Sequence, residues 1–386
     1  MKRICIVTAT RAEYGLLKNI ILKLKKNSDF EVNIVATGMH LSPEFGFTYK
    51  EIEKDGLEID EKIEILLSSD TPVSISKSMG LALISFAEYF SRKRPDIVII
   101  LGDRFEMLSV CCAAMNERIP IAHLYGGETT EGAVDESIRH SISKMSYLHF
   151  TANEEYGKRV IQLGENPERV FNVGAMGVEN ILNTKLLTRE ELEDSINYKL
   201  DRKYAIITFH SVTLEKKTSK KQFENILKVC DKYNDMKYIF TKANCDEGGR
   251  IINSMIDDYV SKNNNAVAFE SLGMVRYLSA VKYAAMVIGN SSSGIVEVPV
   301  FNVPTINIGD RQKGRLQGDT VINCKPNFAD ISDAIEKARS DEFKDKIKNS
   351  KNIFGDGNTS DKIVRIISEF LRNEKVHLKK KFYDLP

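Results

Sequence analysis

Short apolar runs alternate along this chain with stretches in which apolar residues recur every three or four positions. The run at residues 4–8 predicts a strand, and the spacing of Leu17, Ile20, Ile21 and Leu24 predicts the helix after it. This alternation of strand and helix is repeated over most of the sequence. It predicts parallel pairing and a doubly wound α/β fold.

The predicted elements form two series. In the first series, strands are expected at 4–8, 32–36, 96–101, 119–124, 148–151 and 170–173, and helices at 75–90, 105–116 and 135–145. In the second series, strands are expected at 204–209, 238–241, 266–269, 286–288, 305–308 and 320–323, with helices such as 222–233 and 249–260. The run at 96–101 is almost wholly apolar and β-branched, which is typical of a strand covered on both faces.

The length of 386 residues exceeds the roughly 250–300 residues at which a single core stops growing. We therefore expect two Rossmann-like domains, 1–178 and 179–360, joined near a polar segment at 183–203. Ligands bind beyond the carboxyl ends of strands in such sheets, so a cleft faced by both domains is the expected site. Residues 361–386 hold a final amphipathic helix and tail.

Charge and cysteine content exclude several classes of function. The net charge of +1 gives no electrostatic reason to expect a nucleic acid or membrane partner. The six cysteines lack metal-site spacing and predict a reducing, cytoplasmic compartment. No glycine-rich dinucleotide fingerprint follows the first strand and no Walker loop occurs, which disfavours NAD and ATP folds.

The segment 289–297, Gly-Asn-Ser-Ser-Ser-Gly-Ile-Val-Glu, follows an apolar strand and predicts the start of a helix. Free backbone N–H groups, the hydroxyls of Ser291 and Ser292 and a helix dipole are the groups that a diphosphate needs. A second cationic loop at 309–315 carries Arg311. Together they predict a diphosphate site that requires no metal.

Carboxylates gather at the ends of two other predicted strands. Asp103 follows the strand at 96–101, and Glu128, Glu131 and Asp135 follow the next one. Several carboxylates at one place can take different pKa values, which supplies an acid and a base. A turn with a salt bridge explains Asp103 equally well, and an intrahelical pair with Arg139 explains Asp135.

Three further residues follow strands in the same manner. His210 ends the first strand of the second half, where we expect a role in the cleft. Arg11 stands at the equivalent place in the first half and is suited to holding a phosphate. Asn244 follows another strand, where a plain turn is as good an explanation as ligand contact.

Six motifs occur here in the order of a known family: Thr10-Arg11-Ala12-Glu13-Tyr14, Gly102-Asp103-Arg104, the block 126–140, Phe209-His210, 289–297 and 309–315. The chain resembles the hydrolysing UDP-N-acetylglucosamine 2-epimerases over essentially its whole length. These enzymes make N-acetylmannosamine and UDP for sialic acid synthesis. Their close relatives act on UDP-N,N'-diacetylbacillosamine in legionaminic acid synthesis.

The resemblance implies an architecture like that of GT-B glycosyltransferases, with UDP on the second domain, the final helix packed on the first, and a homo-oligomer. It implies no metal and no other cofactor. By motif match, Asp103 and Asp135 are the expected catalytic carboxylates, Arg139 would support them, and His210 would act at the sugar or the leaving phosphate. Ser291, Ser292 and Arg311 would hold the diphosphate, Glu297 the ribose and Arg11 the nucleotide.

One position departs from the family. Some relatives carry a third catalytic glutamate directly before Gly-Gly-Glu, where this chain has Tyr125. Tyrosine does not serve as a carboxylate base near neutral pH. We expect Glu128 or Glu131 to supply the missing group, unless the change marks a different sugar.

The resemblance implies elimination of UDP to a 2-acetamidoglucal, followed by hydration. Four rival functions share parts of the same site: a 2-epimerase for the diacetamido sugar, a GT-B glycosyltransferase, a non-hydrolysing epimerase and a non-catalytic nucleotide-sugar sensor. The nucleotide site alone does not separate these rivals. The carboxylates favour an epimerase, because it requires proton transfer on both faces of the sugar.

Overall fold

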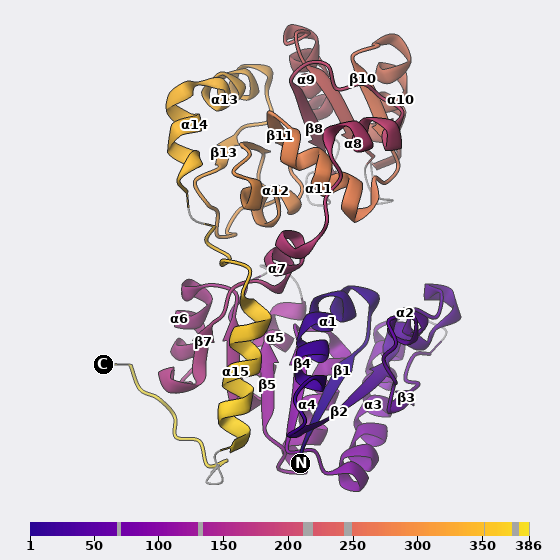
Figure 1. Cartoon of the computed structure of the whole chain (residues 1–386), viewed down its shortest axis with the longest axis vertical. Helices are drawn as coiled ribbons and strands as arrows, with labels where there is room; N and C mark the ends of the chain where they lie inside the picture. Colours follow the sequence, from indigo (N-terminus) through magenta and orange to yellow (C-terminus); the bar gives the residue numbers. More distant parts are fainter. Residues whose placement is uncertain are drawn as a thin grey trace. The chain divides into compact units, whose positions relative to one another are not determined.

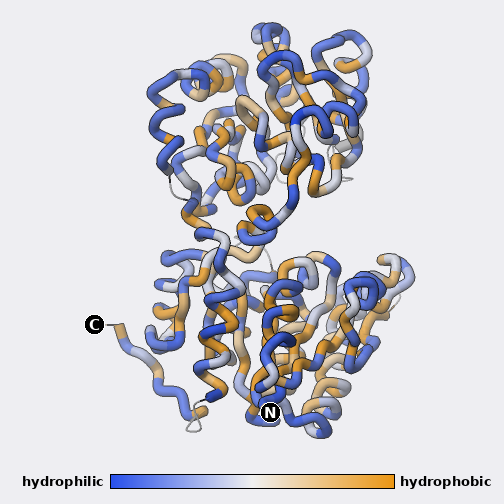
Figure 2. Tube along the Cα trace, in the orientation of Figure 1, coloured by the Kyte–Doolittle hydropathy of each residue, from blue (hydrophilic) through white to orange (hydrophobic). Residues whose placement is uncertain are grey.

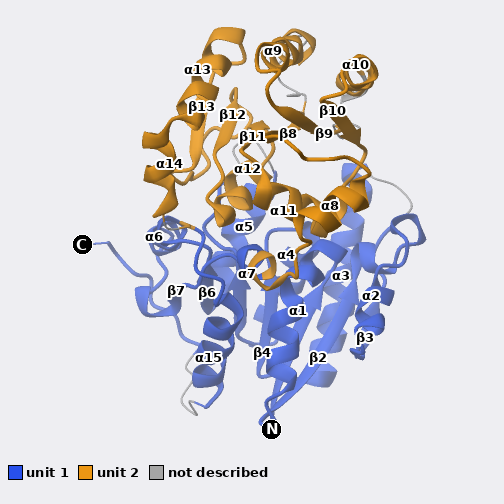
Figure 3. Ribbon diagram, turned by 45° about the horizontal axis from the view of Figure 1, so that its top comes forward, with its two compact units in different colours: residues 1–179, 354–386 blue, residues 180–353 orange. Residues whose placement is uncertain are grey.

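The chain forms two compact units, residues 1–179 with 354–386, and residues 180–353 (Figure 3). The computed structural model describes residues 1–67, 71–129, 134–210, 219–242, 249–350, 352–372 and 378–385. The predicted domain boundaries at 178 and 360 lie one and seven residues from the observed divisions. The final helix belongs to unit 1.

Unit 1 is built on a seven-stranded sheet in the order β3-β2-β1-β4-β5-β6-β7, and every pair is parallel. Its strands are β1 (Lys2–Thr8), β2 (Phe30–Thr37), β3 (Glu61–Ile63), β4 (Ile97–Leu101), β5 (Ile121–Leu124), β6 (Leu148–Thr151) and β7 (Val170–Asn172). Its helices are α1 (Arg11–Lys25), α2 (Tyr49–Lys54), α3 (Pro72–Lys93), α4 (Phe105–Asn116), α5 (Val134–Met145), α6 (Glu154–Gln162) and α15 (Thr359–Arg372), while α7 (Met176–Asn183) crosses the division (Figure 1).

Unit 2 has a six-stranded sheet in the order β10-β9-β8-β11-β12-β13, also parallel throughout. Its strands are β8 (Tyr204–Thr208), β9 (Lys237–Thr241), β10 (Ala266–Phe269), β11 (Met286–Gly289), β12 (Thr305–Ile308) and β13 (Val321–Cys324). Its helices are α8 (Arg189–Ile196), α9 (Ser219–Lys232), α10 (Gly249–Lys262), α11 (Gly273–Tyr283), α12 (Ser293–Val296), α13 (Phe328–Arg339) and α14 (Asp341–Lys348). The predicted α/β class with two doubly wound sheets is confirmed.

Each sheet has one topological switch point, where the strand order reverses. In unit 1 it lies between β1 and β4, and in unit 2 between β8 and β11. Helices leave a crevice at the carboxyl ends of strands at such a point, which is where ligands bind in doubly wound folds. Each unit therefore has one favoured place for a site.

Hydrophobic burial explains the strand and helix positions. All five residues of β4 are buried, as expected for a strand covered by helices on both faces. Along α15, hydrophilic and hydrophobic residues alternate (Figure 2), and Ile363, Ile367 and Leu371 face one side at helical spacing. These three residues join the buried cluster that contains Leu17 of α1, so residues far apart in sequence share one core.

The polar segment 183–203 was expected to be a connection, but it contains α8. Thr188 accepts a hydrogen bond from the backbone N–H of Glu191, whose side chain accepts one from the N–H of Thr188, which forms a capping box. Leu192 and Ile196 are buried in the core of unit 2. Two apolar positions four residues apart were too weak a period to predict this helix.

Candidate active site

The switch point of unit 1 carries an ion pair between a strand end and a helix. Asp103 lies two residues after the end of β4, and its carboxylate pairs with the guanidinium of Arg139 on α5. Arg139 is buried, and its Nη1 also donates to the backbone carbonyl of Glu128 at 2.8 Å and to Glu136 Oε2 at 3.0 Å. One arginine therefore joins β4, the loop after β5 and α5.

Asp135 is exposed in the first turn of α5. Burial by itself would lower the pKa of the Arg104 guanidinium, but Glu106, Glu13 and Asp135 act on it electrostatically and raise it. Asp135 therefore interacts electrostatically with Arg104. Asp103 directly precedes Arg104 in the chain. Of the carboxylates expected at this place, Asp103 is paired with Arg139, and Asp135 acts electrostatically on Arg104.

Two buried carboxyl groups beside Arg104 were missed by the sequence reasoning. Glu106 Oε1 accepts from Arg104 Nε at 2.6 Å, and Glu13 accepts from the backbone N–H of Ala9 at 2.7 Å. Burial raises the pKa of Glu13 to about 7, with a smaller contribution from Glu106. The capping-box spacing Thr10-x-x-Glu13 was the available signal for Glu13.

Tyr125 has a positive φ of 67°, which is uncommon for a residue with a bulky side chain. Its hydroxyl accepts a hydrogen bond from the backbone N–H of Gly177 at 3.4 Å. Burial raises its pKa, and the charge of Glu128 raises it further. A neutral phenol therefore occupies this position. Glu131, one expected substitute for the relatives' glutamate, lies outside the described residues.

The switch point of unit 2 is organised by a buried asparagine. Asn290 accepts from the backbone N–H of His210 through Oδ1 and donates to the carbonyl of His210 through Nδ2, both at 2.8 Å. The Asn290 carbonyl accepts from Arg311 Nη1 at 3.0 Å and from buried Gln312 Nε2 at 2.9 Å. Asn290, which precedes the serine segment, thus links the expected residues His210 and Arg311, and it also binds Gln312, which was not anticipated.

The predicted helix after β11 is only one turn long. Its bounds are Ser293–Val296, and a 3₁₀ helix at Val298–Phe301 follows. Pro299 ends the α-helix, because proline lacks an N–H and its ring clashes with the carbonyl four residues earlier. A single turn has little macrodipole, so anion binding here would depend on backbone N–H groups and hydroxyls.

The remaining expected residues of unit 2 are partly bonded within the unit. Glu297 accepts from the hydroxyl of Ser293, which lies 2.7 Å from the hydroxyl of Tyr277. Ser291 Oγ accepts from the N–H of Ser293 at 3.3 Å, while Ser292 makes no side-chain cap. The predicted ribose contact of Glu297 would compete with this chain of hydrogen bonds.

Arg11 and Asn244 are the other two residues that were expected to contact the nucleotide. Arg11 is 71% exposed in its side chain, and its Nη1 lies 3.8 Å from Glu51 Oε1. Asn244 falls outside the described residues. Arg11 begins the helix after β1, beside the switch point of unit 1, and its distance to Glu51 is too long for a hydrogen bond.

Each unit has a cavity at the carboxyl ends of its strands, beside the switch point in unit 1 and two strands farther along the sheet in unit 2. In unit 1 a cavity of about 860 Å³ is lined by Gly38, Phe45, Leu67, Arg104 and Phe105, among others. In unit 2 a cavity of about 740 Å³ follows the ends of β12 and β13 and is lined by residues from the loop of Arg311, including Lys313 and Arg315. Both are in the size range of ligand sites.

Within the described part of the chain, no group of three His, Cys, Asp or Glu side chains is placed to hold a metal ion. The same residues include no helix with the length and apolar character needed to span a membrane.

Sequence comparisons identify relatives over most of the chain. A family model described as UDP-N-acetylglucosamine 2-epimerase matches residues 22–368. A Campylobacter jejuni protein named GDP/UDP-N,N'-diacetylbacillosamine 2-epimerase (hydrolyzing) is 49% identical over 344 residues, which are 89% of each chain. The Escherichia coli polysialic acid biosynthesis protein P7 is 39% identical over 100% of this chain and 98% of its own. A Legionella pneumophila UDP-N,N'-diacetylbacillosamine 2-epimerase (hydrolyzing) is 35% identical over 95% and 96%.

Solved structures share the fold. The Neisseria meningitidis UDP-GlcNAc 2-epimerase bound to UDP-GlcNAc has a TM-score of 0.78 at 18% identity, covering 96% of this chain and 100% of that one. A Listeria monocytogenes putative UDP-N-acetylglucosamine 2-epimerase has a TM-score of 0.79 at 16% identity, covering 100% of both chains.

Proposed function

We infer the reaction of this chain from one premise: the chain belongs to the UDP-N-acetylglucosamine 2-epimerase family. It is a hydrolysing UDP-sugar 2-epimerase, which converts UDP-N-acetylglucosamine and water to N-acetylmannosamine and UDP. The observation that carries this proposal is the Asp103–Arg139 pair, which ties the carboxylate after β4 to the helix that bears Asp135.

The chemistry requires this kind of site. The hydrogen at C2 of the sugar is barely acidic, because its neighbour is an acetamido nitrogen and not a carbonyl. Breaking the C1–O bond to UDP creates positive character at C1, which acidifies C2–H. A base removes that proton, UDP leaves with the C1–O electron pair, and a 2-acetamidoglucal forms. Water then adds OH at C1, and an acid returns a proton to C2 from the opposite face.

We assign Asp103 and Asp135 to the two proton transfers, without choosing a face for either. Arg139 orients Asp103, and Glu128 lies on the same loop system. The departing diphosphate requires cations and N–H donors. Ser291, Ser292, Arg311 and His210 are the proposed donors, because Asn290 holds their segments together. Glu297 and Arg11 are proposed to contact the ribose and the nucleotide.

A second sugar has a specific observation in its favour. Two of the relatives, at 49% and 35% identity, are named as diacetylbacillosamine 2-epimerases. Both sugars carry the 2-acetamido group on which the elimination depends, so the same carboxylates serve either. The 2,4-diacetamido sugar is therefore the second candidate substrate.

One experiment tests the reaction and the choice of sugar. The protein is incubated in heavy water with UDP-N-acetylglucosamine or with UDP-N,N'-diacetylbacillosamine, and both mixtures are followed by NMR. We expect free UDP and a 2-epimer with deuterium at C2 from one of them. Deuterium incorporation without UDP release would identify a non-hydrolysing epimerase.

An unchanged NMR spectrum with both sugars would contradict an epimerase and favour a nucleotide-sugar sensor or a glycosyltransferase without its acceptor. Asp103→Asn is the matched control, because it removes a proposed catalytic group and leaves the proposed UDP site of unit 2 intact. The cytoplasmic location and the homo-oligomer stay predictions. Size-exclusion chromatography with light scattering tests the oligomer.

A further inference from the structure

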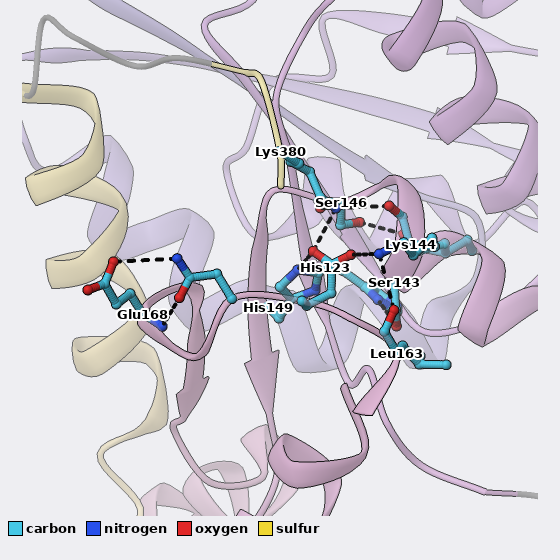
Figure 4. Close-up of polar contacts among 11 residues, drawn as sticks. His123, Ser143, Lys144, Ser146, His149, Leu163, Glu168 and Lys380 are labelled. Carbon is cyan, nitrogen blue, oxygen red and sulfur yellow. Dashed lines mark hydrogen bonds and ion pairs between the residues drawn. The ribbon is translucent and has the colours of Figure 1, made fainter. Parts of the chain in front are cut away.

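The C-terminal tail, residues 378–385, lies on unit 1 and reaches the end of α5. The Nζ of Lys380 donates to the backbone carbonyls of Lys144 at 2.9 Å and Ser146 at 2.6 Å (Figure 4). The last carbonyls of a helix have no partner within it, and a cation there also complements the helix dipole. Lys380 therefore caps the helix that carries Asp135 and Arg139.

The same ammonium group balances a buried carboxylate. Glu165 is 1% exposed, and it lies 2.6 Å from Lys380 Nζ, 2.8 Å from Lys144 Nζ and 3.0 Å from His149 Nε2. Burial would raise the pKa of Glu165, but these three partners hold it at about 2. Glu165 and its three partners therefore join the tail, α5, β6 and the loop after α6.

Further contacts keep the tail in place. The N–H of Tyr383 donates to the carbonyl of Gly164 at 2.9 Å. The ring of Phe382 lies against Gly164, where an added Cβ would come within 2.3 Å of it. Lys144 Nζ lies 4.8 Å from the centre of that ring, within cation–π range.

A second contact holds the same turn of α5. The Nε2–H of buried His123 donates to the carbonyl of Gly102 at 2.8 Å, and its Nδ1 accepts from Ser143 Oγ at 3.1 Å. Gly102 directly precedes Asp103. The end of β4 and the last turn of α5 are therefore held in one register, and the tail binds the carbonyl of Lys144 in the same turn.

We propose that Lys380 is a positioning residue for the reaction: by capping α5 it keeps Arg139 and Asp135 in register with Asp103. The proposal rests on the proposed function, since it concerns the same carboxylates. Arg139 is five residues from Lys144, about 7.5 Å along the helix axis. Displacement of a catalytic group by about 1 Å costs up to about a hundredfold in rate.

The test compares the full-length variants Lys380→Met and Lys381→Met. Both remove one tail lysine, but Lys381 is exposed and serves as the matched control. We expect Lys380→Met to lower kcat for UDP release by about ten- to a hundredfold. Its KM should stay within about twofold of wild type, because the proposed diphosphate donors belong to unit 2 and Arg11 lies on α1, not on α5. Lys380→Arg should recover most of kcat, since it keeps the cation.

Hydrogen exchange gives a readout that does not depend on catalysis. We expect peptides that cover α5 to exchange at least about tenfold faster in Lys380→Met, with α15 unchanged. If Lys380→Met does not fold, Phe382→Ser replaces it, with a smaller change in the same direction.

If α5 exchanges at the same rate in Lys380→Met and Lys381→Met, Lys380 does not stabilise α5. If α5 exchanges faster in Lys380→Met but kcat is unchanged, Lys380 does not position the catalytic groups. A fall in kcat that Lys380→Arg does not recover would also count against a positioning role. Failure of the wild-type protein to release UDP contradicts the proposed function instead, and the exchange comparison still decides whether the tail braces α5.

Discussion

The candidate site of unit 1 is held by charged side chains, whereas that of unit 2 is held by amides and backbone. In unit 1 the buried Arg139 binds a carboxylate and a carbonyl from separate segments. In unit 2 the side chain of Asn290 pairs with both backbone groups of His210, and its carbonyl receives Arg311 and Gln312. Both sites occupy the switch point of a parallel sheet.

The difference matches the proposed tasks of the two units. Proton transfer needs carboxylates whose orientation is fixed. The guanidinium of an arginine fixes a carboxylate through directed hydrogen bonds. Binding of a diphosphate needs N–H donors that are already aligned, which backbone held by amide side chains provides. We therefore expect substitutions in unit 1 to act mainly on kcat and those in unit 2 mainly on stability and nucleotide affinity.

The largest loss of stability should follow Gly289→Ala, which places a side chain against the backbone of a neighbouring strand in unit 2. Gly289 has φ of 142°, and a Cβ there would lie 1.8 Å from the carbonyl oxygen of Thr208. We expect a loss of about 3 kcal/mol or more in the free energy of unfolding. Urea unfolding followed by circular dichroism measures it. Gly318→Ala is the control, because its Cβ would meet nothing within 4 Å. Equal midpoints would contradict the tight strand contact.

Asp103→Asn and Asp135→Asn test the charged site of unit 1. Each should lower kcat at least about a hundredfold, equivalent to about 2.7 kcal/mol in the barrier, because a general acid or base is lost. UDP affinity, measured by titration calorimetry, should not change. Asp96→Asn is the matched control at the opposite end of β4, where Asp96 pairs with Lys2. Near-normal turnover of either site variant argues against its catalytic role.

Acid should destabilise unit 1 first, because three buried histidines lie there. Burial lowers the pKa of His40 to about 4 and of His123 to about 3, and it also lowers the pKa of His149. The unfolded chain takes up protons near pH 6.5 and the folded chain does not, so stability is lost as the pH falls below 6.5. The expected loss at pH 5 is about 2 kcal/mol for each of His40 and His123, whose folded pKa values lie below that pH.

Hydrogen exchange at pH 7.5 and pH 5 measures the loss of stability of unit 1, with peptides of unit 2 as the internal reference. Glu13 opposes the effect in unit 1, since its raised pKa favours the folded state as the pH falls below about 7. His123→Gln should reduce the acid sensitivity, because Glu13 titrates in both proteins. An unchanged acid sensitivity in that variant would contradict a neutral His123.

The smallest effect on stability should follow Arg11→Ala. Arg11 is largely exposed at 3.8 Å from Glu51, and such pairs contribute less than about 1 kcal/mol. We expect the melting temperature to stay within about 2 °C of wild type. A rise in KM or in the Kd of UDP would therefore report loss of a nucleotide contact. If neither constant changes, Arg11 does not contact the nucleotide.

Most strands were predictable from local pattern, because a strand buried on both faces is a short apolar run whatever surrounds it. The run 286–288 became β11 and the run 305–308 became β12. The helix α8 and the short strand β3 were missed, since their buried residues are too few to show a period. The helix after β11 was predicted but is one turn long, because Pro299 ends it.

The sequence alone determined the family, the two doubly wound sheets and most of the candidate residues, because these depend on local apolar pattern and on motifs at strand ends. Only the tertiary structure decided which groups meet. Arg139 bridging Asp103 and Glu128, Asn290 holding His210, and Lys380 capping α5 all join segments that are distant in the chain. Burial also shifts the pKa of Glu13, and a residue's burial depends on the packing of every neighbouring element.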